Sequence, residues 1–219
     1  MAEGLPTARI VRGAAFFVGL VLAWEAAVRL FRIPDWLIPS PWQIAAVIAE
    51  KHWIVLEHTL VTFEETALGF LLALVVGVAF AIGIVYFPIL RDTLYPAIIM
   101  LNSFPKIAVA PLFVIWIGVG IEAKIANAFL LALFPIVINA ILGLTDMEPE
   151  LLELVRAMSR SRSVLFWKIR LPHSLPYLFA GCKIAVSLAV IGAIVGEFIS
   201  GRSGLGYLIL SANNYFNTA

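Results

Sequence analysis

The stretch ELLELVRAMSRSRSVLFWKIRLPHSLP, residues 150–176, concentrates charge in a chain that is 62% hydrophobic and only 13% charged. The mean hydropathy of +1.01 is far above the range of soluble globular domains. A chain of 219 residues does not bury that much apolar surface inside one water-soluble core. The chain is therefore predicted to lie in a bilayer, with this stretch as a polar loop between apolar runs.

Five apolar runs are long enough to cross hydrocarbon, which takes about 20 helical residues. They lie at roughly 13–31, 66–88, 94–118, 125–144 and 177–199. Between the first two runs, Trp36, Trp42 and Trp53 stand among prolines and isolated charges, which favours a segment lying along the membrane interface. The pattern predicts an all-α membrane protein with a single domain over residues 1–219.

The first run is interrupted by Glu25 and Arg29, which are four residues apart and are predicted to pair on one helix face. Arg9 and Arg12 before an apolar run also resemble the start of a signal peptide. Because no small-residue cleavage site follows and Glu25 breaks the run, a retained span is favoured.

The polar loop, residues 145–176, is predicted to contain two short helices. Thr145 or Asp146 would cap the first helix, which has acidic residues in its first turn and an apolar side. The basic and hydroxyl-rich SRSRS would break it, and VLFWKIR would form a second helical stretch that Pro172 ends. Pro176 would then begin the last span.

The distribution of Lys and Arg orients the chain, because cytoplasmic loops carry the excess of positive charge. With the loop and the N-terminus inside, the inner segments hold Arg9, Arg12, Arg91, Arg156, Arg160, Arg162, Lys168 and Arg170, and the outer ones hold Arg29, Arg32, Lys51, Lys124 and Arg202. The loop is therefore predicted to be cytoplasmic.

The loop resembles the cytoplasmic EAA loop of the permease subunits of binding-protein-dependent ABC importers. That pattern is Glu-Ala-Ala, three residues, Gly, nine residues, Ile, any residue, Leu-Pro. Glu153 begins it here, and Ile169, Leu171 and Pro172 complete it at the expected spacing. The chain departs from it at Leu154 and Val155 in the two Ala positions and at Ser159 in the Gly position.

The resemblance extends over most of residues 34–210, through IPSPWQI, LNSFPKIAVAPLFVIWIGVG, FPIVINAILGL and LPYLFAGCKIAVSLAVIGAIVGEFISGRSGLGYLI. These segments are similar to the nitrate, sulfonate and taurine group of permeases. The resemblance implies a type I importer helical bundle in the inner membrane, with a second permease copy, cytoplasmic ATPase subunits and an extracytoplasmic solute-binding protein. It also implies a further span after residue 219.

The resemblance further implies that the loop carries a coupling helix that docks on the ATPase. ATP and Mg²⁺ would bind the partner, and no phosphate-binding GxxxxGK[ST] occurs in this chain. No cofactor, metal site or catalytic residue is expected. The residues expected to contact the ATPase are Glu150, Glu153, Leu154, Val155, Arg156, Met158, Ser159, Arg160, Ile169, Leu171 and Pro172.

Polar residues within the apolar runs are candidates for the solute pathway, because each is costly in lipid. They are Asn102, Ser103, Lys106, Asn127, Asn139 and Glu197. The first three lie among prolines, where a broken helix is tolerated only against protein or a water-filled cavity. Three alternatives remain open: Lys106 in cytoplasmic headgroups, the two Asn residues bonding neighbouring helices, and Glu197 solvated or paired near the outer surface.

Several other residues receive structural interpretations. A face of small residues on the last run, from Gly181 to Gly196, suits a helix facing the second permease copy. Lys183 is within reach of the cytoplasmic interface. The single cysteine, Cys182, is expected to be a packing residue, and His52, His58 and His173 are expected to be surface residues rather than ligands.

Two other classes of protein were weighed. A membrane-embedded enzyme is disfavoured, because the sequence predicts no paired intramembrane carboxylates and holds no HExxH or GxSxG. A secondary transporter would leave the charged loop unexplained, and it would transport without an ATPase. The solute is expected to be a nitrate-, sulfonate- or taurine-type anion or a small organic nutrient such as a pyrimidine precursor. NSFPKIAVAP favours the organic solute, because it differs from the Pro-Pro version associated with sulfonate and nitrate members.

Overall fold

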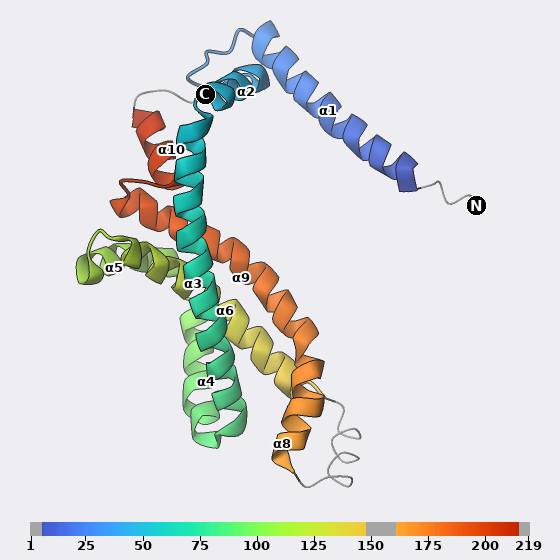
Figure 1. The fold of residues 1–219 in the computed structure, drawn as a ribbon, viewed down its shortest axis with the longest axis vertical. Coiled ribbons are helices and arrows are strands. Elements are labelled where there is room, and N and C mark those ends of the chain that lie inside the picture. Colours follow the sequence, from blue (N-terminus) through green and yellow to red (C-terminus); the bar gives the residue numbers. More distant parts are fainter. Residues whose placement is uncertain (1–5, 148–160, 215–219) are drawn as a thin grey trace. The chain divides into compact units, whose positions relative to one another are not determined.

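The computed structural model describes residues 6–147 and 161–214, and every regular element in these ranges is a helix (Figure 1). The chain divides into two compact units. The first comprises Met1–Glu57 with Leu208–Ala219, and the second comprises His58–Tyr207. The prediction of an all-helical membrane protein is confirmed, with four helices long and apolar enough to span a membrane and a fifth candidate formed by a bent pair.

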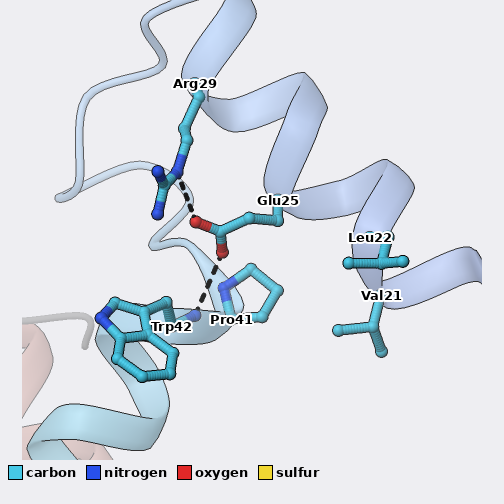
Figure 2. Close-up of a pocket in the computed structure, with 6 residues that line it drawn as sticks. All are labelled: Val21, Leu22, Glu25, Arg29, Pro41 and Trp42. Atoms are coloured by element: carbon cyan, nitrogen blue, oxygen red, sulfur yellow. Dashed lines mark hydrogen bonds and ion pairs between the residues drawn. The ribbon is translucent and has the colours of Figure 1, made fainter. Parts of the chain in front are cut away.

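The first unit contains α1 (Pro6–Leu30) and α2 (Pro41–Glu50). Ser40 begins α2 with a reciprocal capping box, in which its hydroxyl accepts from Gln43 N and the Gln43 side chain accepts from Ser40 N. Glu25 joins the two helices: its Oε1 accepts from Arg29 Nε at 2.6 Å, and its Oε2 accepts from Trp42 N at 3.1 Å. Figure 2 shows this carboxylate between the two partners. The predicted Glu25–Arg29 pair is confirmed.

The second span begins earlier than its hydropathy predicts. The sequence places its start near residue 66, whereas α3 (His52–Tyr86) is one continuous helix from His52. The polar residues of its first turns lower the hydropathy of the window, but Thr62, Glu65 and Thr66 are buried against the rest of the second unit. The interfacial segment predicted before residue 66 is therefore helical and belongs in part to this span.

The predicted third run is broken. α4 (Pro88–Asn102) ends before Pro105, and a 3-10 turn, η1 (Lys106–Val109), leads into α5 (Ala110–Ile117) at a bend of 94°. A residue that precedes proline is disfavoured in the helical region, which explains the break at Phe104. The run at 94–118 is thus two helical arms rather than one straight span, as the cluster of prolines suggests.

The centre of the second unit is the contact between α6 (Ile121–Thr145) and α9 (Leu171–Ser200), which lie side by side in Figure 1. A Cβ on Gly192 would lie 2.7 Å from Ala128 Cα, and one on Gly181 would lie 2.8 Å from Asn139 Cβ. On α6, a Cβ on Gly143 would lie 2.9 Å from Ser174 Cα. Only glycine permits so close an approach of the two backbones.

This contact corrects the interpretation of the small-residue face. Gly181, Ala185, Ala189, Gly192, Ala193 and Gly196 are all buried within the single chain, where α6 covers them. The face is therefore used inside one permease chain and is not left free for a second copy. Gly69 and Gly77 likewise bring α3 against α6, at Ala128 and Ile136.

The described part of the polar loop also differs from its prediction. Thr145 and Asp146 end α6 rather than begin a new helix, and the Thr145 hydroxyl donates to Ile141 O. α8 (Arg162–Leu165) and a π-helical turn, η2 (Phe166–Arg170), run without interruption into α9. Pro172 lies in the first turn of α9, where a missing N–H is tolerated, so it does not end the helix. Pro176 lies inside α9 rather than at its start.

Candidate functional site

A buried ion pair lies at the end of the second unit opposite the polar loop. Lys124, in the first turn of α6, places its Nζ 2.8 Å from Glu65 Oε1 on α3. The Lys124 side chain is 6% exposed and the Glu65 side chain 0% exposed. Burial of two charges is costly unless they are paired and hydrogen-bonded, so the two helices are held together by a contact that tolerates little change. Lys124, which the charge distribution assigns to the outer side, is thus buried in the first turn of α6.

Glu197, near the end of α9, is the second buried carboxylate. Its Oε1 accepts a hydrogen bond of 2.6 Å from the Thr62 hydroxyl, and its Oε2 accepts from Gly206 N at 2.5 Å. The residue is 1% exposed, so it is not solvated at the outer surface as one of the alternatives proposed. Thr62, which bonds Glu197, lies three residues from Glu65 on the same face of α3, so the two carboxyl groups are neighbours. The structure thus brings together two carboxylates that the sequence does not show as a pair.

These side chains also cap α10 (Leu205–Asn214). Leu205 N donates to the Thr62 hydroxyl at 2.8 Å, and Gly204 N donates to His58 Nδ1 at 2.9 Å. Gly204 has φ +101°, and a Cβ there would overlap the Glu197 carboxylate. The amides of Gly204, Leu205 and Gly206 are thus all satisfied by side chains of α3 and α9, as a helix N-terminus requires. His58 is partly buried and hydrogen-bonded rather than a free surface residue.

Three buried oxygens around this cluster have no hydrogen-bond partner among the described residues. They are Glu65 Oε2, Thr66 Oγ1 and Asn127 Oδ1. The Asn127 amide nitrogen donates to Ala123 O at 3.1 Å on its own helix, and it faces Gly196 across the α6–α9 contact. We refer to Thr62, Glu65, Lys124 and Glu197 as the ionic cluster.

A second group of polar residues lies at the bend between α4 and η1. Lys106 Nζ donates to Asn102 O at 2.8 Å and to Asn102 Oδ1 at 3.1 Å. The same ammonium lies 4.7 Å from the centroid of the Phe134 ring on α6, within range of a cation–π interaction. Asn102 and Ser103 are exposed in the single chain. The bend therefore presents an ammonium, an amide and a hydroxyl on an uncovered surface.

The base of the polar loop is closed by side chains of α9. His173 Nε2 lies 2.6 Å from Asp146 O, and the Tyr177 hydroxyl donates to the Asp146 carboxylate. His173 is exposed, as predicted, and is hydrogen-bonded to the end of α6. Of the predicted coupling residues, Ile169, Leu171 and Pro172 lie on η2 and the start of α9. The others, Glu150, Glu153, Leu154, Val155, Arg156, Met158, Ser159 and Arg160, lie outside the described residues.

The predicted pathway residues do not form one site. Asn102, Ser103 and Lys106 lie together at the bend, whereas Glu197 lies in the ionic cluster with Asn127 beside it. Asn139 stands apart, with its amide donating to Pro135 O at 2.8 Å on the same helix, next to Gly181. Sequence reasoning did not find Thr62 and Glu65, because they precede the predicted start of the second span.

Comparison with known proteins assigns the family. Residues 66–219 match the family described as the binding-protein-dependent transport system inner membrane component. The chain belongs to this family. It is 34% identical over 194 residues to a probable ABC transporter permease of Haemophilus influenzae, covering 89% of this chain and 79% of that protein. It is also 35% identical to a formylaminopyrimidine transport permease of Halalkalibacterium halodurans, covering 88% and 77%, and 34% identical to a riboflavin transport permease of Chloroflexus aurantiacus, covering 91% and 75%.

The permease is thus a multi-pass inner-membrane subunit of a bacterial ABC importer. It is not itself the ATPase: nucleotide binds a separate partner subunit, and the family carries no cofactor of its own. Membership also implies an ATPase partner and a solute-binding protein.

Proposed function

We propose that this permease imports a small heterocyclic nutrient, related to a pyrimidine precursor or a flavin, along the bend between α4 and η1. Two copies of the permease would face each other across this surface. The polar loop, residues 145–176, would dock on the ATPase and carry its movement to the spans. The observation that carries the proposal is the exposed bend, where Lys106 lies between Asn102 and the Phe134 ring.

The bend supports a pathway because a chain turn of 94° leaves backbone groups outside the regular helical pattern. Such a turn is tolerated within a membrane only against protein or water. Asn102 and Ser103 are exposed in the single chain, so a second copy or a water-filled passage would have to cover them. A water-filled passage between two permease copies would surround the bend with both protein and water.

The bend also has features that suit a planar polar ring. The Lys106 ammonium and the Asn102 amide supply donors to carbonyl oxygens and ring nitrogens of a solute. Phe104 is 69% exposed beside them and offers an aromatic face for stacking. Identity to the formylaminopyrimidine and riboflavin permeases is 35% and 34%, against 25% for a taurine permease and 29% for a nitrate permease.

The loop base supports the role in coupling. Asp146 at the end of α6 is bonded to His173 and Tyr177 of α9, so both ends of the loop are fixed to one pair of helices. The continuous helix from Ser163 to Ser200 extends from the loop through the full length of the contact with α6. A displacement of the loop would therefore move α6 and α9 together.

The proposal is tested by uptake into proteoliposomes that contain the permease and its ATPase, with the cognate binding protein outside. We expect ATP-dependent uptake of a formylaminopyrimidine or riboflavin, and no stimulation of ATP hydrolysis by taurine or nitrate. Lys106→Met should reduce uptake at least about tenfold, the cost of one lost charged hydrogen bond to solute. Lys183→Met, at an exposed position on α9, is the matched control. Stimulation by taurine or nitrate instead would assign the other solute class.

A further inference from the structure

The ionic cluster carries an unbalanced charge. Glu65 and Glu197 supply two carboxylates, and Lys124 supplies one ammonium, which leaves one negative charge if all three are ionised. The residues are 0%, 1% and 4% exposed. An uncompensated charge buried away from water is strongly unfavourable, and more so within a bilayer. Something must therefore neutralise the cluster.

Among the residues that the structure describes, no other charged group is placed to do so. The His58 ring accepts a hydrogen bond from Gly204 N at Nδ1, so its proton is on Nε2 and the ring is neutral. Tyr207 stacks on this ring, and its phenol adds no positive charge. The nearby charged residues on the packed elements, Glu57, Glu64, Glu122 and Arg202, are all exposed.

The hydrogen bonds distinguish the two carboxyl groups. Both oxygens of Glu197 already accept from donors, Thr62 Oγ1 and Gly206 N, so neither is left without a hydrogen bond. Glu65 accepts from Lys124 at Oε1 only, and its Oε2 is buried with no partner among the described residues. Glu197 is bonded to Thr62, which lies one turn from Glu65 on the same face of α3, so a proton on Glu65 Oε2 would be donated to Glu197.

We propose that Glu65 and Glu197 form an acid pair that binds one proton, carried by Glu65 and donated to Glu197, at the N-terminus of α10. The proton completes the hydrogen bonds of Glu65 and makes the cluster neutral. It also links α3 to α9 and α10 at the end of the bundle opposite the loop. Loss of the proton would leave two adjacent carboxylates, which repel each other at the contact that holds α10. The binding of α10 at this end is therefore proton-dependent.

The proposal predicts an asymmetry between the two glutamates. Glu65→Gln imitates the protonated acid: its amide oxygen accepts from Lys124 and its NH₂ donates to Glu197, so the permease should fold and retain uptake. Glu197→Gln replaces an acceptor with an NH₂ group that faces either Gly206 N or the Thr62 hydroxyl, so it should disrupt the α10 cap. Glu64→Gln, at the exposed neighbouring position, is the control for both variants.

The decisive measurement is infrared spectroscopy of the permease–ATPase complex in nanodiscs at neutral pH. The wild-type spectrum should contain a protonated-carboxyl carbonyl band that shifts in D₂O, disappears in Glu65→Gln and persists in Glu64→Gln. Between about pH 6 and about pH 9 the unfolding midpoint of the wild type should fall as pH rises, because only the folded state holds the proton, and this fall should be absent in Glu65→Gln.

Three results would overturn the proposal. A wild-type spectrum without this band at any pH in that range means that both glutamates are ionised. Stabilisation of the wild type by Na⁺, lost in Glu65→Gln, means that a metal cation neutralises the cluster. A band that survives in Glu65→Gln belongs to another residue. If Glu65→Gln fails to fold, the pH titration of the wild-type band decides alone, since the band must disappear at the pH where the stability stops falling.

Discussion

Lys124 and Glu65, whose charged atoms lie 2.8 Å apart, join the first turn of α6 to α3 at a point that is closed to solvent. The pair is 59 residues apart in sequence, and neither member lies in a predicted apolar run. Removal of Lys124 leaves the Glu65 and Glu197 carboxyl groups buried without a cation. This contact is therefore expected to be among the most sensitive in the second unit.

Lys124→Met should destabilise the permease by about 3–5 kcal/mol, the typical cost of leaving a buried charge without its partner. The measurement is the thermal unfolding midpoint of the solubilised complex, with Lys183→Met as the exposed control. The double variant Lys124→Met with Glu65→Leu should recover little of the loss, because the Glu197 carboxylate stays buried without a cation. Equal effects of Lys124→Met and Lys183→Met would contradict the buried pair.

Gly192→Ala should separate α6 from α9. Its Cβ would lie 2.7 Å from Ala128 Cα and 2.7 Å from Asn127 O, which are backbone atoms that cannot rotate away. The expected cost is about 1–3 kcal/mol, typical of an overpacked contact. Gly19→Ala, on α1 where a Cβ meets nothing within 4 Å, should be neutral or stabilising by up to about 1 kcal/mol. The measurement is the unfolding midpoint of each variant in the same detergent, and equal midpoints for Gly192→Ala and Gly19→Ala would contradict the prediction.

Thr62→Val should loosen the start of α10. The change removes the acceptor of Leu205 N and the donor to Glu197, at a cost of about 1–3 kcal/mol for buried groups left without partners. Limited proteolysis near Arg202 should accelerate. Thr93→Val removes a hydroxyl that bonds only to its own helix, at Ile89 O, and should leave the cleavage rate unchanged. Identical rates in the two variants would show that Thr62 does not hold this segment.

Tyr177→Phe should weaken the linkage between ATP hydrolysis and uptake. It removes the hydrogen bond to Asp146 and leaves His173 as the remaining contact to the end of α6. We expect more ATP hydrolysed per solute imported, with little change in basal hydrolysis. Tyr95→Phe removes a hydroxyl from the α4 side of the second unit and serves as the control. If Tyr177→Phe leaves the ratio of ATP hydrolysed to solute imported unchanged, the Tyr177–Asp146 hydrogen bond does not contribute to coupling.

The sequence predicts the helical class, the apolar runs and the family well, because long hydrophobic stretches and the Glu153 to Pro172 spacing are local signals. It fails where a polar residue is compensated by a distant partner. Glu65 lowers the hydropathy before residue 66, and nothing local shows that Lys124 neutralises it. The starts of α3 and α6 both lie earlier than predicted for this reason.

The candidate site residues are likewise predictable only where the signal is local in the sequence. The bend at Lys106 is predictable, because Pro105 and Pro111 act on their immediate neighbours. The contacts of Glu197 are not predictable, because its hydrogen-bond donors are Thr62, on α3, and Gly206, which follows a turn after α9. A small-residue face likewise indicates close packing without naming the partner, which proves to be α6 of the same chain.

The glycine contacts between α6 and α9 have one more consequence. Where backbone touches backbone at Gly143, Gly181 and Gly192, no side chain lies in between that could bend and absorb a push. The two helices are therefore expected to move as one rigid body. A displacement of α6 beside Asp146 would then also displace α9 at Glu197.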